Sequence, residues 1–253
     1  MRNERRWRYW LLLAIVAAFV AGTALHKPIP QTASYHAFAD RRTVLGVPNF
    51  WNVISNLPFL LVGIAGLRAL RRSGPPGPLY PAYAVFFLGV TLVAFGSGYY
   101  HLAPDNSRLA WDRLPMTLAF MAFVAIVVGE HISGPLGRRC LPFLLLIGLL
   151  SVLYWHVSER QGTGDLRPYL LVQFLPLALV PLITLMFPSA VSRVYYIWGL
   201  LGAYAAAKVL EIFDERIFLA LGVVSGHTLK HLAAAAGVYF LVIMTAALSG
   251  GLR

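Results

Sequence analysis

Long runs of apolar residues recur along the whole chain, and each is close to the roughly 20 residues that a helix needs to cross a bilayer. They lie at about 8–25, 51–70, 80–101, 113–131, 140–156, 168–187, 193–213 and 227–249. The links between them are short and hold turn formers, as in SGPPGP (73–78), SGPLG (133–137) and FPS (187–189). No long linker or internal repeat interrupts the pattern. The sequence therefore predicts an all-α, polytopic membrane helix bundle of eight helices.

The first apolar run allows two interpretations. It follows MRNERRWRYW and ends at AGTALHKP, where the small residues resemble a signal-peptide cleavage region. Trp7, Tyr9 and Trp10 are instead typical of an aromatic belt at a membrane interface, which favours an uncleaved N-terminal transmembrane helix or signal anchor within residues 1–30. Both interpretations place residues 26–50 outside the cytoplasm. Both also leave residues 31–253 as one membrane domain of seven helices.

Composition and charge agree with a membrane protein and indicate its orientation. The chain is 58% hydrophobic and 12% charged, and its mean hydropathy is +0.69. Basic residues cluster beside the predicted cytoplasmic helix ends, most densely at Arg5, Arg6 and Arg8. We therefore expect a multi-pass protein of a bacterial-type inner membrane with both termini in the cytoplasm. The net charge of +11 then reflects topology and contact with anionic lipid, because no basic patch of the kind that binds nucleic acid is visible. The single cysteine, Cys140, excludes an intramolecular disulfide and a cysteine metal cluster.

Five polar residues fall at one predicted depth, toward the outer ends of three helices. Ser97 and His101 are four residues apart, as are His227 and His231, so each pair shares a helix face. Asp112 follows at the same level, after a short loop. Three imidazoles leave one position open on a tetrahedral zinc, which is the pattern of a catalytic site. Because such groups are costly inside a membrane, we interpret the five as a functional site facing the outer side.

Other polar residues have plainer interpretations. Ser97 lies in a GSG context that suits close helix packing, and Asp112 at a helix start could cap that helix. Lys208 and Glu211 are expected to pair within the bundle, and Lys230 to snorkel or to meet Glu211. A further group near the outer end of the second helix could contact either the metal surroundings or a neighbouring helix: Asn52, Ser55 and Asn56.

The residues of the predicted site also carry a family resemblance. The chain has Ser-x3-His, an Asp eleven residues after that His, and a C-terminal His-x3-His, and its segment NFWNVISNLPFLLVG (49–63) holds an FWN-x-x-SN pattern. This combination resembles the alkaline ceramidase family, which belongs to the CREST superfamily of membrane hydrolases. The resemblance spans about residues 35–249 and implies a seven-helix core, to which the N-terminal helix would be an addition.

The resemblance implies a role for each matched residue. His101, His227 and His231 would hold Zn²⁺, and Ser97 would hydrogen-bond the substrate carbonyl or the attacking water. Asp112 would act as general base and then as general acid. The implied reaction is hydrolysis of the amide of ceramide, or of a related N-acyl lipid, to a fatty acid and a sphingoid base or other amine. The lipid substrate would arrive laterally from the outer leaflet.

One implied feature of the family does not fit this chain. Animal members carry an acidic N-terminal stretch that binds Ca²⁺ near the zinc, but the corresponding SYHAFADRRTVLGVPNFWN offers only Asp40 as an acid. Arg41 and Arg42 follow it, and Asn49 stands where the family places a Glu. Because Ca²⁺ takes several oxygen ligands, we expect no family-like calcium site here.

Two functions of other classes remain open at this level. A lipid-sensing, receptor-like seven-helix protein would use the same histidines for a structural zinc. A transporter is suggested only by intramembrane charge, and neither inverted repeats nor broken midplane helices support it. The sequence leaves the oligomeric state, monomer or homo-oligomer, undetermined.

Overall fold

The computed structural model describes residues 6–73, 77–187 and 194–248. Within these residues the regular elements are helices, which confirms the predicted all-α class. They are α1 (Arg6–Leu25), α2 (Phe50–Ile54), α3 (Leu57–Ser73), α4 (Tyr80–Leu102), α5 (Asn106–His131), α6 (Gly134–Arg160), α7 (Arg167–Met186), α8 (Val194–Ile212), α9 (Asp214–Leu221) and α10 (Gly226–Leu248). Arg5 and parts of the links predicted at 73–78 and 187–189 lie outside the described residues.

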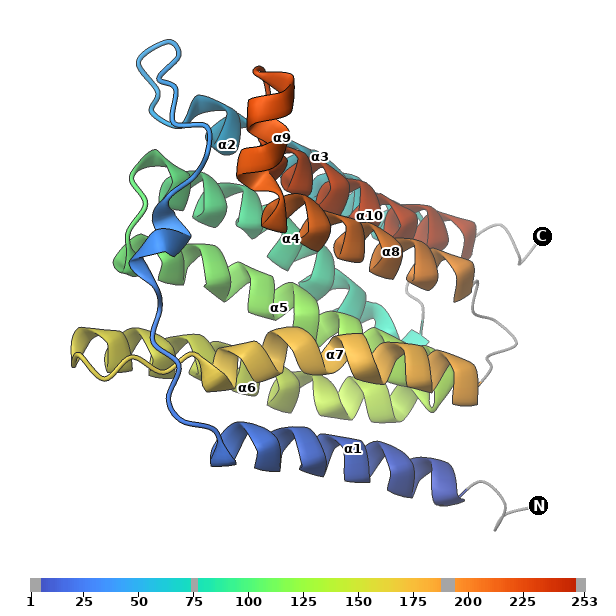
Figure 1. Cartoon of the computed structure of the whole chain (residues 1–253). Helices are drawn as coiled ribbons and strands as arrows, with labels where there is room; N and C mark the ends of the chain where they lie inside the picture. Colours follow the sequence, from blue (N-terminus) through green and yellow to red (C-terminus); the bar gives the residue numbers. More distant parts are fainter. Residues whose placement is uncertain (1–5, 74–76, 188–193, 249–253) are drawn as a thin grey trace.

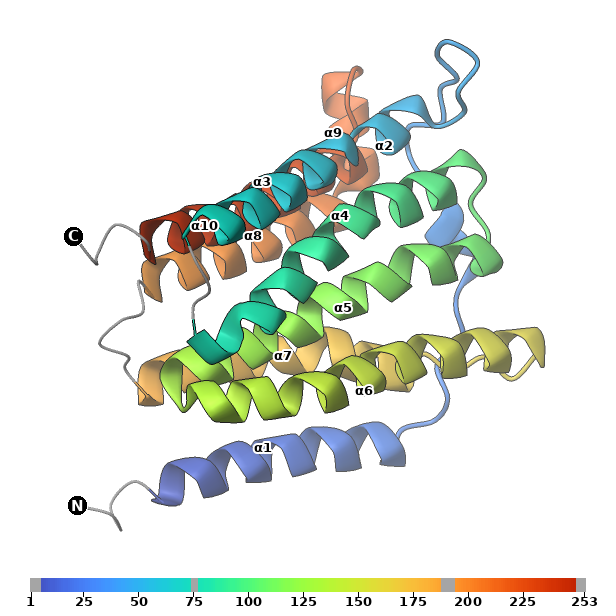
Figure 2. The ribbon, with the colours of Figure 1, turned by 180° about the vertical axis from the view of Figure 1, so that it is seen from behind.

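The long helices form a polytopic membrane bundle. Seven spans are each long and apolar enough to cross a membrane, with α2 and α3 counted as one span, and α8 with α9 forms an eighth candidate that is bent by 75°. The helices lie side by side, and α1 begins at the same end of the bundle at which α10 ends (Figure 1). The central pair is α4 and α5, with α3 and α10 packed on one side and α6 and α7 on the other (Figure 2).

The helices extend beyond the predicted apolar runs at their polar ends. α5 begins at Asn106 rather than near residue 113, because polar and charged residues interrupt its first two turns and a search for apolar runs does not detect them. The carboxylate of Asp105 caps this helix by accepting a hydrogen bond from the backbone N–H of Arg108 at 2.7 Å. The alternative that Asp112 caps the helix is therefore wrong, and Asp112 lies nearly two turns inside it.

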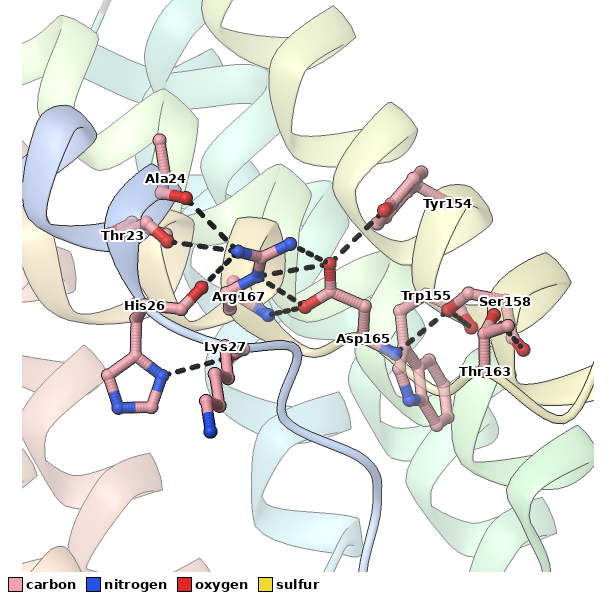
Figure 3. Close-up of polar contacts among 10 residues, drawn as sticks. All are labelled: Thr23, Ala24, His26, Lys27, Tyr154, Trp155, Ser158, Thr163, Asp165 and Arg167. Atoms are coloured by element: carbon pink, nitrogen blue, oxygen red, sulfur yellow. Dashed lines mark hydrogen bonds and ion pairs between the residues drawn. The ribbon is translucent and has the colours of Figure 1, made fainter.

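α1 lies on the outside of the bundle, along α7, and none of its described residues is buried. At its C-terminal end, Arg167 of α7 donates to the backbone carbonyls of Thr23, Ala24 and His26 (Figure 3). At its other end, the Arg8 side chain donates to the carbonyl of Met186. Between these polar contacts, Leu12 packs against the hydrophobic core and the Tyr9 ring lies 5.2 Å from that of Phe187, centroid to centroid.

The Arg167 contact depends on an acid in the loop between α6 and α7. Both carboxylate oxygens of Asp165 accept hydrogen bonds from the Arg167 guanidinium, at 2.9 and 2.8 Å. The carboxylate also accepts a hydrogen bond from the Tyr154 hydroxyl at 3.1 Å (Figure 3). The hydrogen bonds from Arg167 hold the pKa of Asp165 at about 2, below its ordinary value. The guanidinium is therefore oriented toward the end of α1 by a buried carboxylate that is ionised at neutral pH.

Residues 26–49, the connecting segment, run across one end of the bundle from α1 to α2 (Figure 1). The segment is fixed by contacts to several helices. The carbonyl of Ile29 accepts from the backbone N–H of Leu166 at 2.8 Å, and the His36 ring bonds the Tyr100 hydroxyl at 2.8 Å and the Asn106 side chain at 2.9 Å. This path brings Phe38 and Asp40 to the end of the bundle where α4 ends and α10 begins.

Candidate metal centre and lipid cavity

Three buried histidines converge where α4 ends and α10 begins. His101 is 1% exposed, His227 5% and His231 6%, and one ring nitrogen from each lies within 4.8 Å of the other two. The Nε2 atoms of His101 and His227 are 3.3 Å apart. Two nitrogens bound to one tetrahedral zinc at about 2.05 Å would be separated by roughly 3.3 Å. The group could therefore hold a metal ion, and its all-imidazole composition is consistent with zinc.

The hydrogen-bond network leaves Nε2 of His231 available as a ligand. The Ser55 hydroxyl donates to the carbonyl of Asn52 at 3.1 Å and lies 2.8 Å from Nδ1 of His231. Since the single Ser55 proton is engaged, Nδ1 of His231 is the donor to the Ser55 oxygen, and Nε2 keeps its lone pair. Nδ1 of His101 is buried without a hydrogen-bond partner among the described residues. The donor set thus fits a ligated ion better than a hydrogen-bonded histidine cluster.

Close backbone approaches position the helices that carry these histidines. A Cβ on Gly226, at the start of α10, would lie 2.2 Å from the carbonyl oxygen of Leu210 in α8, so this position requires glycine. Beside it, the Asp214 carboxylate accepts from the backbone N–H of His227 at 2.6 Å and from that of Ala39 at 3.0 Å. Asp214 therefore links the connecting segment, α9 and the first turn of α10, where a negative charge is also favoured by the helix dipole.

Ser97 and Asp112 lie beside a close approach of α4 and α5 and line the same cavity. Both are largely buried, at 3% and 9% exposure. A Cβ on the neighbouring Gly96 would lie 2.2 Å from the carbonyl oxygen of Trp111, so only glycine allows this approach. Both side chains open into the cavity that His231 also lines.

This cavity has a polar end and an apolar remainder. Its polar end is lined by residues from five helices: Ser97, Asp112, Gln173, Tyr204, Lys208, Glu211, Lys230 and His231. The rest is lined by aliphatic and aromatic side chains such as Phe86, Val90, Phe123 and Val238. A cavity divided in this way suits a molecule with a polar head and a long apolar tail.

Three charged residues at the polar end are joined by ion pairs and form the Lys208–Glu211–Lys230 cluster. Lys208 donates to one oxygen of Glu211 at 2.7 Å and Lys230 donates to the other at 2.5 Å. This confirms both pairings expected from the sequence, and it joins α8 to α10. Asn52 instead bridges neighbours, since its amide donates to the carbonyl of Asp40 at 3.1 Å and its oxygen accepts from Thr228 at 3.1 Å.

The connecting segment packs against the histidines at this end of the bundle. The Phe38 ring, 5% exposed, has its centroid 4.4 Å from that of His227 and 4.7 Å from that of His101. Arg42 holds both oxygens of Asp40, at 2.9 and 2.7 Å, and also donates to the carbonyl of Val223. Burial alone would raise the pKa of Asp40, but these bonds from Arg42 hold it below its ordinary value. Asp40, the one acid in this segment, is therefore paired with Arg42 through both carboxylate oxygens.

The sequence did not single out Phe38 or Asp214, although both contact the histidines. Phe38 lies in an irregular segment and Asp214 at a bend between helices, so neither belongs to a periodic pattern that would mark it. Ser55 was noted only as one of three polar residues with two possible roles, and the structure places it on His231. Glu211 was expected only as an ion-pair partner, and the structure adds that it lines the cavity.

Comparison with known proteins agrees with this arrangement. The chain matches the family model described as Ceramidase over residues 44–252, a range that holds α2 to α10 and leaves α1 outside. Among curated proteins, none matches the chain. The matched range contains the three histidines, Ser97 and Asp112, and the chain belongs to the ceramidase family.

Proposed function

We propose that this protein is a zinc-dependent intramembrane hydrolase that cleaves the amide bond of ceramide or a related N-acyl lipid. Membership of the ceramidase family supports a lipid amide hydrolase. The observation that carries the finer proposal is the convergence of three buried histidines with Ser97 and Asp112 at the polar end of an apolar cavity. His101, His227 and His231 would hold the zinc ion.

When bound, zinc would lower the pKa of a water molecule toward 7 and polarise the amide carbonyl. Asp112 is the group that would move the protons. Its carboxylate would take a proton from the attacking water and then deliver it to the leaving nitrogen, so that the C–N bond breaks to give a fatty acid and an amine. The Ser97 hydroxyl would donate a hydrogen bond to the carbonyl oxygen, on which negative charge develops.

The shape of the cavity supports an orientation for the lipid. The acyl chain would lie among the apolar residues such as Phe86 and Val90, with the amide at Ser97 and Asp112 and the head group beside the polar end. We also propose that the site faces the outer, non-cytoplasmic side of the membrane and that the substrate reaches it from the lipid. The arginines near the helix ends opposite the site, including Arg68, Arg71 and Arg72 of α3, support this orientation.

A single assay tests the proposal. Purified protein is incubated with a panel of N-acyl lipids, with and without a metal chelator, and metal content is measured alongside fatty-acid release. We expect one zinc per chain, chelator-sensitive hydrolysis and recovery on adding zinc. His101→Ala should abolish zinc binding and hydrolysis, whereas His156→Gln, on α6, should change neither. Stoichiometric zinc with no release from any lipid would contradict the enzyme and favour the receptor-like alternative with a structural zinc.

A further inference from the structure

The Lys208–Glu211–Lys230 cluster has no part in the proton transfers described above, yet it lies in the same cavity. Only three lysines occur in the chain, and two of them are here. Charged groups at membrane depth are costly and mark functional sites by default. A purely structural ion pair between α8 and α10 would need one lysine, so the second cation requires a separate explanation.

The hydrogen-bonding capacity of the cluster is one-sided. Each carboxylate oxygen of Glu211 is already engaged by one ammonium group. Each ammonium has three N–H donors and no acceptor, so the capacity that remains unused is entirely donor capacity. Two ammonium groups and one carboxylate give these three residues one excess positive charge, which the Asp112 carboxylate offsets on the side of Lys230. The cluster is therefore suited to a ligand group that accepts hydrogen bonds and carries negative charge.

Lys208 is the member placed to meet such a group. Lys230 also faces the charge of Asp112, whereas the Nζ atom of Lys208 lies 6.0 Å from the ring centroid of Phe174 and 5.9 Å from that of Tyr204. Its side chain is 33% exposed, compared with 17% for Lys230. Lys208 thus lines the cavity with an ammonium group whose carboxylate partner, Glu211, is shared with Lys230.

We infer that the Lys208–Glu211–Lys230 cluster is a head-group site that selects N-acyl lipids whose polar head carries an anionic oxygen group, such as a carboxylate. The inference rests on the proposed function, since it names the substrate class of that same cavity. It predicts a preference for an anionic over a neutral head group when the acyl chain is the same. A hydrogen bond to a charged group contributes roughly tenfold or more to affinity, so the preference should be of about that size.

Two lipids of nearly equal size test the inference: N-oleoylglycine, with a carboxylate, and N-oleoylethanolamine, with a hydroxyl. The ratio of kcat/KM for the anionic lipid to that for the neutral lipid is measured for each protein. We expect Lys208→Gln to lower this ratio about tenfold and Lys208→Arg, which keeps the charge, to preserve it. Lys27→Gln removes an exposed lysine from the connecting segment and should leave the ratio unchanged.

Glu211→Gln distinguishes recognition of the head group from a purely structural ion pair between α8 and α10. It removes the carboxylate that both lysines contact, and with it the ion pair between α8 and α10, but it increases the positive charge, so it should raise the ratio. Equal losses toward both lipids in each variant, Lys208→Gln and Glu211→Gln, would show that the cluster only supports the packing of this region and would overturn the inference. If Glu211→Gln does not fold, Lys208→Gln and Lys208→Arg still test the inference. Equal ratios of kcat/KM in these two variants would overturn it.

Binding of the same two lipids to the Asp112→Asn protein keeps the two proposals distinguishable. Hydrolysis of both lipids with a ratio that does not depend on Lys208 would overturn the head-group site and leave the hydrolase intact. Binding that prefers N-oleoylglycine through Lys208, without hydrolysis of either lipid by the wild type, would support the head-group site and contradict the hydrolase.

Discussion

At the scale of single residues, the candidate site contains both groups that its sequence spacing indicates and groups that spacing cannot reveal. The i and i+4 spacing of His227 and His231 follows directly from helix geometry. The distance of 3.3 Å between His101 and His227 does not, because it depends on how two helices pack 126 residues apart in the chain. Phe38 and Asp214 reach the histidines through turns, which carry no periodic pattern.

Asp112 should be needed for catalysis but not for metal binding. Since it lies outside the histidine group and shares the cavity with Ser97, Asp112→Asn should retain zinc and lose activity by roughly 10²–10⁴-fold, the usual contribution of a general acid–base group. Zinc content and lipid hydrolysis are measured on the same preparation. Loss of zinc together with activity would instead make Asp112 a ligand or a structural support, and full turnover would contradict the proposed mechanism.

Ser55 should affect the metal through His231. The hydrogen bond at 2.8 Å fixes which ring nitrogen of His231 carries the proton, and loss of such a supporting contact typically weakens metal affinity by about 10–100-fold. We expect this loss in Ser55→Ala, measured by competition with a zinc chelator of known affinity. Ser151→Ala removes a similarly buried hydroxyl on α6 and serves as the control. Unchanged affinity in Ser55→Ala would show that the tautomer is set by other contacts.

At the scale of the elements, apolar runs predicted the long helices well and their ends less well. A run of about 20 apolar residues marks the part of a helix inside the bilayer, whereas the polar first turns of α5 and the short α9 lie outside that signal. The division between α2 and α3 at Ser55 and Asn56 was also not predicted, because both helices lie within one apolar run. Sequence therefore locates spans but not the capped, polar ends where the site is built.

The contact between α4 and α5 leads to a prediction for Gly96. In Gly96→Ala the new methyl group would meet the Trp111 carbonyl at 2.2 Å, so the two helices must move apart beside Ser97 and Asp112. Overpacking of this kind costs about 1–3 kcal/mol. We expect a lower melting temperature and reduced hydrolysis, while Gly98→Ala, where nothing lies within 4 Å, should resemble the wild type. Equal behaviour of the two variants would contradict the close approach.

The link between α1 and α7 should weaken in acid. Because the pKa of Asp165 is lowered to about 2 in the folded protein, against about 3.9 when unfolded, its stabilising effect is complete above about pH 4 and disappears as the pH falls toward 2. Asp165→Asn should therefore reduce stability at pH 7 by about 2 kcal/mol and show little further loss in acid. Thermal unfolding of both proteins between pH 7 and pH 2.5 measures this, and a constant difference across the range would contradict it.

At the scale of the whole molecule, the bundle has two distinct ends. The histidines lie where α4 ends and α10 begins, and α1 begins at the opposite end (Figure 1). An even number of spans returns the chain to the side from which it started. The proposed outward position of the site depends on a count of eight spans together with the arginine-rich start of the chain.

A reporter protein fused after Arg253 tests the expected number of membrane spans. We expect a fluorescent protein at this position to be active and a phosphatase that requires the periplasm to be inactive. The same fusion after Leu221, in α9, should give the opposite result, because this position lies at the end of the bundle that holds the site. A periplasmic C-terminus would contradict eight spans and the orientation of the site. Cleavage of α1 as a signal peptide would leave the expected result unchanged.

The way in which α1 is attached has a practical consequence for protein engineering. A helix without buried residues, held by Arg8 and Arg167 and packed on the core through Leu12, places few demands on the rest of its sequence. Its apolar stretch is therefore an exchangeable module, which a designer could replace with another membrane anchor of equal length. The exchange would need to keep Arg8 and the three backbone carbonyls that accept hydrogen bonds from Arg167. It would leave the sequence of α2 to α10 unaltered.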